Sequence, residues 1–165
     1  MFVTGPTLVE VDDSDFAWLL HKEPQPRSGL RPPPGGVDEP VIVEHVRGIV
    51  ARLRAAGCSA GWMIVAADEV VGLCSYKRPP SPQGEVEIGY GIAASRRNRG
   101  YATRAVAAML AHARRDPAVR VVVAGTVPDN AASQRVLERN GFKRVGECPD
   151  PDDGSMVILW EYPVK

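Results

Sequence analysis

The sequence predicts one α/β domain, in which a single mixed, mostly antiparallel sheet of about six to seven strands carries helices on both faces. The chain has 165 residues, the length of one ordinary domain, and contains no internal repeat or interdomain linker. Segments that alternate with a period of two are interleaved with segments of helical period. At the centre, the order strand, loop, helix, strand is typical of a right-handed crossover between parallel strands. We therefore expect residues 1–165 to form one domain.

The N-terminal part is expected to contain one strand and two helices. Residues 7–11 alternate as a strand does, and Asp12 or Asp13 is expected to cap the short helix that follows. Residues 40–56 have helical spacing, and Gly57 is a typical helix stop. The apolar positions of this second helix are Val43, Val46, Ile49, Val50 and Leu53.

Between these helices, residues 23–40 are rich in proline and glycine. Six prolines and three glycines in this stretch exclude a helix interior or a central strand. We expect a surface loop within the domain. Its composition fits a functional lid and a disordered segment equally well.

The remaining elements follow in a regular order. Strands are expected at 62–67, 70–76, 85–92, 119–127, 142–147 and 156–162, and helices at 100–115 and 130–140. The first two of these strands form a hairpin whose turn is assigned to Asp68 and Glu69. Residues 119–127 are so strongly apolar that we expect both faces of that strand to be buried.

Composition excludes several classes of function. The 20 basic and 20 acidic residues give a formal net charge of +0 and no basic face, which argues against a nucleic-acid partner. Cys58, Cys74 and Cys148 lack CxxC spacing and lie near no histidine cluster, so we expect no metal site. No segment approaches the ~20 apolar residues of a membrane span, and the first ten residues lack the pattern of a signal peptide. We expect a cytoplasmic protein without a membrane partner.

The stretch 94–103 reads ASRRNRGYAT and lies between a predicted strand and an amphipathic helix. Unpaired N–H groups and the positive end of the dipole make a helix start attractive to anions. Gly100 allows close approach to the backbone, and Arg96, Arg97 and Arg99 add positive charge. The Walker and dinucleotide patterns are missing, because no Gly-Lys-Ser/Thr tripeptide occurs and Gly100 is the only glycine here. The stretch indicates a ligand with clustered phosphates; the alternative is a solvated basic turn.

Three blocks of residues, in order and in register, resemble the GNAT superfamily of N-acetyltransferases. Residues 97–102 fit its Arg/Gln-x-x-Gly-x-Gly/Ala signature, and residues 86–90 resemble the strand before that motif. Residues 130–133, Val136 and Gly141-Phe142 resemble the second cofactor block of the family. The resemblance covers about residues 60–147 well and is nearest to the branch of ribosomal-protein N-terminal (alanine/serine) acetyltransferases.

The resemblance implies a sheet splayed at its centre and acetyl-CoA as co-substrate, with no metal. The strands at 85–92 and 119–127 would part to admit the pantetheine arm, which Asn130 would support. The amides after Arg97 would hold the pyrophosphate. The residues expected to bind the cofactor are Ile92, Ala93, Ala94, Arg97, Asn98, Arg99, Gly100, Tyr101, Ala102, Thr103 and Asn130.

Acetyl transfer to an amine requires a base, because a protonated amine has no lone pair. Glu87 matches the strand carboxylate that several family members use as base, and Glu85 is the alternative on the same strand face. Both glutamates could equally be solvated side chains on the sheet, or could attract a cationic amine. The backbone N–H near Ile92 is the expected donor to the carbonyl oxygen.

The leaving thiolate is where the sequence departs from the family pattern. Many family members have a tyrosine four residues before the glycine of Gly141-Phe142, but here that position is Leu137, which cannot donate a proton. Ser133, one turn earlier on the same helix, is the best substitute; the alternative is that Ser133 bonds to the backbone of the first helical turn. Thiolates also leave well unaided.

The resemblance therefore predicts an N-acetyltransferase that acts on a primary amine, either a peptide N-terminus or a small molecule, by direct attack in a ternary complex. Leu137 leaves one alternative open, a non-catalytic acyl-CoA-binding module. A third hypothesis is a phosphate-binding enzyme of another class, which would not prefer CoA over ATP. The sequence leaves the acceptor open, and also the choice between monomer and homodimer.

Overall fold

The computed structural model describes residues 5–21, 23–27 and 29–165. Residues 1–4, which belong to the segment used above to argue against a signal peptide, lie outside the described residues, as does Ser28 of the proline-rich loop. No helix in the described part of the chain is long and apolar enough to cross a membrane.

One seven-stranded sheet runs through the molecule in the order β1-β2-β3-β4-β5-β7-β6. Its strands are β1 (Thr7–Glu10), β2 (Gly61–Ala66), β3 (Glu69–Tyr76), β4 (Glu85–Ile92), β5 (Val121–Thr126), β6 (Lys143–Pro149) and β7 (Met156–Pro163). Among these strands β4 and β5 pair in parallel, and the other neighbours pair antiparallel. The prediction of a mixed, mostly antiparallel sheet is confirmed.

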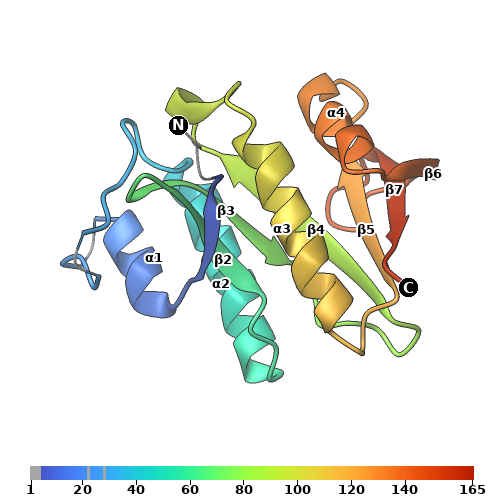
Figure 1. Cartoon of the computed structure of the whole chain (residues 1–165), viewed down its shortest axis with the longest axis horizontal. Helices are drawn as coiled ribbons and strands as arrows, with labels where there is room; N and C mark the ends of the chain where they lie inside the picture. The colour runs from blue at the N-terminus through green and yellow to red at the C-terminus, as the bar shows by residue number, and fades with distance from the viewer. Residues whose placement is uncertain (1–4, 22, 28) are drawn as a thin grey trace.

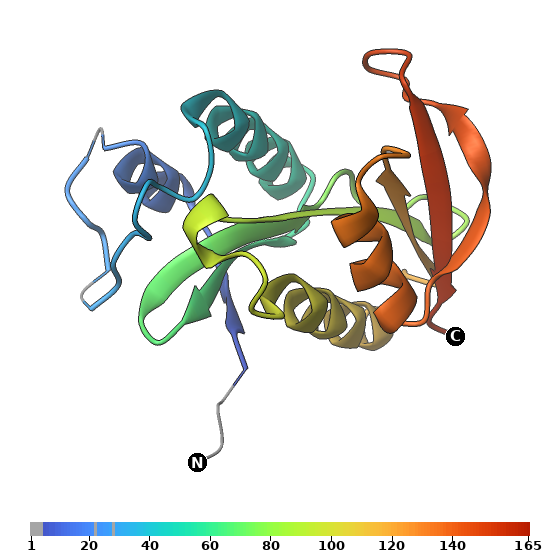
Figure 2. The ribbon, with the colours of Figure 1, turned by 90° about the horizontal axis from the view of Figure 1, so that it is seen from above.

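Helices cover both faces of the sheet, as expected (Figures 1 and 2). The helices α1 (Asp13–Leu19) and α2 (Pro40–Ala55) lie on one face. The helices α3 (Tyr101–Arg115) and α4 (Ala131–Arg139) lie on the other, and a short 3-10 turn, η1 (Ala94–Arg96), precedes α3. Because α3 connects β4 to β5, it forms the predicted crossover between parallel strands.

Local sequence signals explain where the first helices begin and end. The Asp12 side chain accepts a hydrogen bond from Asp15 N–H, and the Asp15 side chain accepts one from Asp12 N–H, so the two residues close a capping box at the start of α1. Pro40 occupies the first turn of α2, where its missing N–H costs nothing. Gly57, with φ of +75°, follows the end of α2 in the left-handed region that glycine adopts readily.

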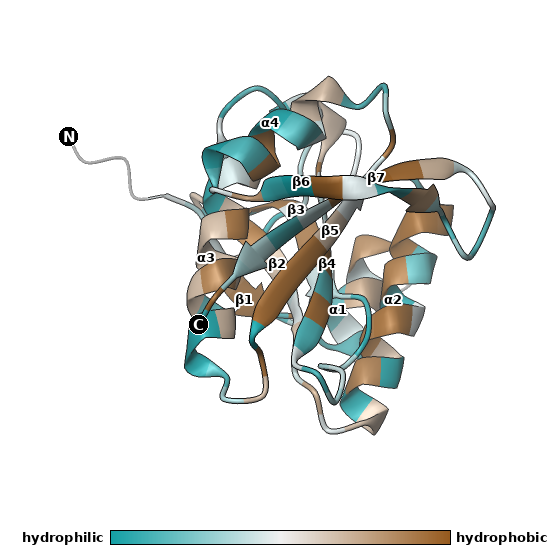
Figure 3. Ribbon diagram, turned by 90° about the vertical axis from the view of Figure 1, so that its right-hand side faces the viewer, coloured by the Kyte–Doolittle hydropathy of each residue, from teal (hydrophilic) through white to brown (hydrophobic). Residues whose placement is uncertain are grey.

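Two apolar clusters fill the spaces on either side of the sheet. On the α3 face, Ile64 and Ile88 pack in one cluster with Met109. On the α2 face, Met63 and Leu73 pack in a second cluster that also includes Val43, Val50 and Phe16. Figure 3 shows the resulting alternation of hydrophobic and hydrophilic residues along α2. Along β4, Val86 and Ile88 face the first cluster, and the residues between them face the α2 side, so the two faces of this strand can carry different functional groups.

The turn between β2 and β3 was assigned one residue too late. Ala67 and Asp68 form it, with φ of +49° and +63°, and Glu69 is the first residue of β3, paired with Ala66. A two-residue hairpin turn with both φ values positive matches the twist of the strands, and it leaves Glu69 in the sheet.

The expectation that β5 is buried on both faces is wrong. Val122, Ala124 and Thr126 are buried, whereas Val121 and Val123 are partly exposed and Gly125 is exposed. The helices α1 and α2 lie over the other half of the sheet and leave this face of β5 uncovered (Figure 2). Apolar composition therefore overstated the burial of this strand.

The proline-rich segment runs between α1 and α2 and is held in place at several points. Arg27 forms two 2.9 Å hydrogen bonds with the buried carboxylate of Asp15. The backbone of Arg31 bonds to Asp68 and Val70 at the start of β3. The Ser95 hydroxyl donates to Pro34 O at 2.7 Å, which ties the segment to η1. These contacts connect the described part of the segment to α1, to the start of β3 and to η1.

Candidate active site

The centre of the sheet is open. In the parallel pair, β4 and β5 share three positions, Glu85 with Val121, Val86 with Val122 and Glu87 with Val123. Beyond them β4 continues to Ile92 beside β3, and β5 continues beside β7. A gap therefore begins after Glu87, as the family resemblance implied.

The backbone of β4 presents unpaired polar groups to this gap. Lys77 N–H donates to Glu87 O and Ala93 N–H donates to Val71 O, both at 2.8 Å, and these bonds fix the phase of the antiparallel ladder. Since such a ladder uses alternate residues, the backbone groups of Tyr90 and Ile92 point away from β3 and toward the gap. The N–H of Ile92 is thus on the side where the sequence placed a donor to a carbonyl oxygen.

The start of α3 is shaped to receive an anion. Gly100 occupies its N-cap position with φ of +78°, and no side chain caps the first-turn amides. Asn98 also has a positive φ, +63°, so the chain turns sharply twice before the helix. A Cβ built on Gly100 would meet no atom within 4 Å, so the space beside this glycine is open. Unpaired amides at a helix start beside open space form an anion seat.

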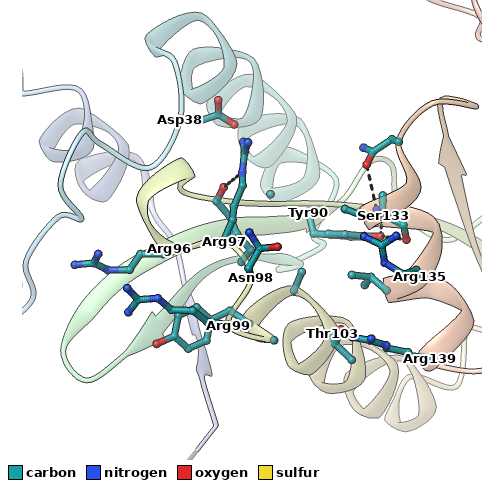
Figure 4. A pocket seen from close by; sticks show the side chains of 18 residues that line it. Asp38, Tyr90, Arg96, Arg97, Asn98, Arg99, Thr103, Ser133, Arg135 and Arg139 are labelled. Atoms are coloured by element: carbon teal, nitrogen blue, oxygen red, sulfur yellow. Dashed lines mark hydrogen bonds between the residues drawn. The ribbon is translucent and has the colours of Figure 1, made fainter.

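A cavity of about 440 Å³ lies between the end of β4, the start of α3 and α4 (Figure 4). The predicted residues that line it are Ile92, Arg97, Asn98, Arg99, Gly100, Tyr101, Ala102, Thr103, Asn130 and Ser133. Two predicted cofactor residues do not line it. Ala93 is fully buried, and its N–H donates to Val71 O. Ala94 is the first residue of η1 and is exposed.

The positive charge of the cavity differs from the sequence expectation. Arg96, which was grouped with Arg97 and Arg99, binds the buried Glu69 carboxylate with Nη2 at 3.0 Å from Oε2. This hydrogen-bonded ion pair lowers the pKa of Glu69 against the opposing effect of burial. The positive charge of Arg96 is therefore compensated by the Glu69 carboxylate.

Two arginines that the sequence analysis missed also line the cavity, Arg135 and Arg139 of α4. Their spacing of four residues puts them on one side of α4, and this spacing, starting two residues after Ser133, is the signal that could have found them.

The side chains of Ser133 and Tyr90 meet at the wall of the cavity. Its hydroxyl oxygen lies 2.8 Å from the Tyr90 hydroxyl, and either oxygen can be the donor. Burial raises the pKa of Tyr90, and the hydrogen bond with Ser133 works in the opposite direction. The sequence analysis did not include Tyr90 in the site, because an aromatic residue at an alternate strand position is usually part of the core.

The structure also shows how α4 begins. The Asn130 side chain accepts the Ser133 N–H at 3.1 Å, so Asn130 is the cap and the Ser133 hydroxyl is directed to Tyr90. Leu137 has no exposed surface and belongs to the core beneath α4. It can neither reach the cavity nor donate a proton.

Glu87 lies apart from these residues. Its Oε1 accepts a 2.8 Å hydrogen bond from Lys77 Nζ, and Arg78 lies 3.7 Å from its Oε2. The side chain shares the α2 face of β4 with Glu85, whereas Tyr90 and Ser133 meet on the α3 face. The structure therefore does not bring Glu87 and Ser133 together, and Glu87 does not line this cavity.

A split parallel pair, an uncapped helix start and an arginine-lined cavity define a class of α/β proteins that bind a phosphate-bearing ligand at the sheet centre. The chain belongs to the acetyltransferase (GNAT) domain family, whose model matches residues 7–143. This confirms the family that the three sequence blocks indicated.

Among curated proteins, the chain is 31% identical to the ribosomal-protein-serine acetyltransferase of Escherichia coli over 90 residues, which are 54% of this chain and 50% of that one. The chain spans between half and about three-fifths of the length of the curated relatives it matches.

Solved structures are similar over nearly the whole chain. The Salmonella typhimurium acetyl transferase that modifies the N-terminal serine of ribosomal protein L7/L12 has a TM-score of 0.72 at 22% identity, and the match covers 98% of this chain and 96% of that one. Mycobacterium smegmatis RimJ in complex with CoA-disulfide has a TM-score of 0.69 at 25% identity, covering 94% and 80%.

Proposed function

We propose that this protein is an N-acetyltransferase that transfers the acetyl group of acetyl-CoA to a primary amine within a ternary complex. One observation carries the proposal: the first-turn amides of α3, uncapped and next to Gly100, open onto a cavity beside the unpaired edge of β4. The family supports the reaction, and the CoA-disulfide bound to Mycobacterium smegmatis RimJ supports the cofactor.

The residues around the cavity fit coenzyme A. The amides after Arg97, with Gly100 and Arg99, would hold the pyrophosphate, since they combine a helix start with positive charge. Asn130 and the gap-facing backbone of Ile92 would hold the pantetheine arm. Ala93 and Ala94 would contribute as the chain segment that leads from β4 into this turn. Acetyl-CoA supplies a thioester whose carbonyl carbon accepts the amine.

Ser133 is proposed as the donor of a proton to the sulfur as the carbon–sulfur bond breaks. Its hydroxyl is part of a hydrogen-bonded pair with Tyr90, which can return the proton that Ser133 gives up. The new carbon–nitrogen bond forms at the same carbonyl carbon, and the proton that the amine loses passes to a base. The products are then an amide and the free thiol of CoA.

Glu87 is proposed as that base, acting through water. Its carboxylate lies on the α2 face of β4, three residues before Tyr90, with Lys77 held against it. Glu85, on the same face at the exposed start of the strand, remains the alternative. The acceptor is proposed to be an α-amino group, in line with the N-terminal serine that the Salmonella typhimurium relative is stated to modify, or a small primary amine.

The test is thiol release from acetyl-CoA in the presence of a panel of amines and N-terminal peptides, together with calorimetric binding of CoA and of ATP. We expect CoA to bind in preference to ATP and at least one amine to release thiol. CoA binding without thiol release would identify the non-catalytic acyl-CoA-binding module instead. Equal binding of CoA and ATP would point to a phosphate-binding enzyme of another class.

A further inference from the structure

A second cavity, of about 280 Å³, lies on the α2 face of the sheet. It shares Asp38, Tyr90 and Gly91 with the larger cavity on the α3 face. The two cavities therefore meet at the end of β4. Figure 4 shows Asp38 on the α2 side of this strand and Thr103 and Arg139 on the other side.

The floor of the second cavity is bare backbone flanked by two charges. Gly89 and Gly91 share the α2 face of β4 and have no side chains to fill the space. A Cβ on Gly89 would lie 3.4 Å from Lys77 Cε, and a Cβ on Gly91 would lie 3.7 Å from Asp38 Oδ2. A cation thus stands over one end of the floor and an anion over the other.

These two charges are not equally available. Lys77 is bound to Glu87 at 2.8 Å. Asp38 Oδ1 accepts the Glu39 N–H at 2.7 Å, and no ion pair within 4 Å involves Asp38 in the part of the chain that the structure describes. Asp38 Oδ2 therefore lies beside Gly91, at the junction of the two cavities, and the side chain of Arg97 points toward it from the larger one (Figure 4).

The walls of the second cavity are mostly apolar. Val37, Ile42, Val46, Ile49 and Leu73 line it. Ile42 is 43% exposed and its neighbour Val41 is 68% exposed, so the apolar surface continues outward over the first turn of α2. Besides Asp38 and Lys77, the lining residues with polar side-chain groups are His45, Cys74, Ser75 and Tyr90.

We propose that Asp38 binds the ammonium group of the acceptor beside Gly91, and that the apolar walls select an acceptor with an apolar group next to its amine. This inference rests on the proposed function and adds the acceptor class to it. Asp38 is a binding residue in this proposal: it holds the amine at the mouth of the cofactor cavity, while Glu87 serves as the base. Small aliphatic amines and peptides with an apolar first residue share this chemistry.

Asp38→Asn is the test variant, because asparagine keeps an oxygen to accept the Glu39 N–H and removes only the charge. For hexylamine and for a Val-Gly-Gly peptide we expect KM to rise by tenfold or more, with unchanged affinity for CoA and unchanged Tm. Asp152→Asn, on the exposed turn between β6 and β7, is the matched control and should change neither KM. Val46→Thr, which keeps the shape of the wall, should reduce the preference for hexylamine over ethanolamine.

Calorimetric titration of each amine into CoA-saturated protein separates this inference from the proposed function. If the wild type binds hexylamine or the peptide at least tenfold more tightly than Asp38→Asn, the inference stands even in the absence of acetyl transfer. Equal binding and equal KM for wild type and variant would overturn it, and so would a wild type that binds neither compound. The compound bound more tightly, amine or peptide, identifies the source of the acceptor.

Discussion

The hydroxyl oxygens of Tyr90, on β4, and Ser133, on α4, lie 2.8 Å apart at the wall of the cavity where the sheet is open. The family pattern would have a tyrosine in α4 at the position of Leu137, one turn after Ser133. In the proposed reaction, a donor contributed jointly by a strand and a helix would take the role of a donor on one side chain. Neither residue alone indicates the pair, because 43 positions separate them.

Ser133→Ala is expected to lower kcat about tenfold, less than the ~100-fold or more typical of general-acid removal, because a thiolate leaves well unaided. Tyr90→Phe should lower kcat by a smaller factor. The double variant should be no slower than Ser133→Ala, since the two hydroxyls act in sequence. The measurement is steady-state thiol release.

Two results would contradict this pairing: losses that multiply in the double variant, or a change confined to KM. The pH profile supplies a further check. Burial raises the pKa of Tyr90 and the Ser133 bond opposes that effect, so the phenol stays protonated above the ~10 of an ordinary tyrosine. Because Tyr90 acts through Ser133, any alkaline fall in kcat due to Tyr90 should be absent from Ser133→Ala.

Gly100→Glu is expected to reduce CoA affinity at least a hundredfold, because a side chain and a negative charge would enter the open space beside the α3 amides. The variant also forces a non-glycine residue to a φ of +78°, which costs about 1–2 kcal/mol of stability. Gly57→Glu is the matched control, with φ of +75° and equally open surroundings after α2. Gly57→Glu should lose similar stability and keep its CoA affinity, as measured by calorimetry. If Gly100→Glu also kept its CoA affinity, the assignment of the anion seat to the start of α3 would be wrong.

Glu87→Gln is expected to slow acetyl transfer chiefly at low pH, where most of the amine is protonated and needs a base. At high pH the amine is already neutral, so wild type and variant should converge. The rate against pH distinguishes this role from a structural one. A uniform loss at all pH values would mean that Glu87 only holds Lys77 in place. Glu85→Gln, on the same face of β4, tests the alternative base in the same assay.

Arg27→Met is expected to destabilise the protein by about 1–3 kcal/mol, because it leaves the buried Asp15 carboxylate without its cation. This loss of stability is smaller than the loss expected for a fully buried ion pair, because the Arg27 side chain is 38% exposed. Arg47→Met is the control, since its partner Asp13 is 75% exposed and its loss should cost under about 1 kcal/mol. Equal losses in denaturant titrations would show that Arg27 does not anchor the loop.

Most of the fold follows from local patterns in the sequence. Asp12 and Gly57 mark helix boundaries by their own hydrogen bonding and φ preferences, so the positions of α1 and α2 were predicted closely. The turn at Ala67 and Asp68 was misplaced by one residue because alanine rarely adopts a positive φ, so Ala67 gives no turn signal beside Asp68. Burial of β5 could not be predicted, because it depends on which half of the sheet α2 covers.

The site divides in the same way. The continuous stretch from Arg97 to Thr103 was predicted because one strand end and one helix start create the anion seat locally. Tyr90, Asp38 and the arginines of α4 were not part of the predicted site, because their places depend on tertiary contacts between distant segments. Likewise, the pairing of Arg96 with Glu69 joins η1 to the β2–β3 hairpin and has no signature in either segment alone.

The short ladder between β4 and β5 has a mechanical consequence. Three paired positions join two wings of the sheet, each of which has longer ladders of its own. The side-chain amide of Asn140, at the end of α4, donates to Thr103 O in α3 and to Val136 O in α4, so it links the two helices on one face of the sheet. A ligand extended along the free edge of β4 would connect the two wings of the sheet, and the protein should resist unfolding more strongly when that ligand is bound.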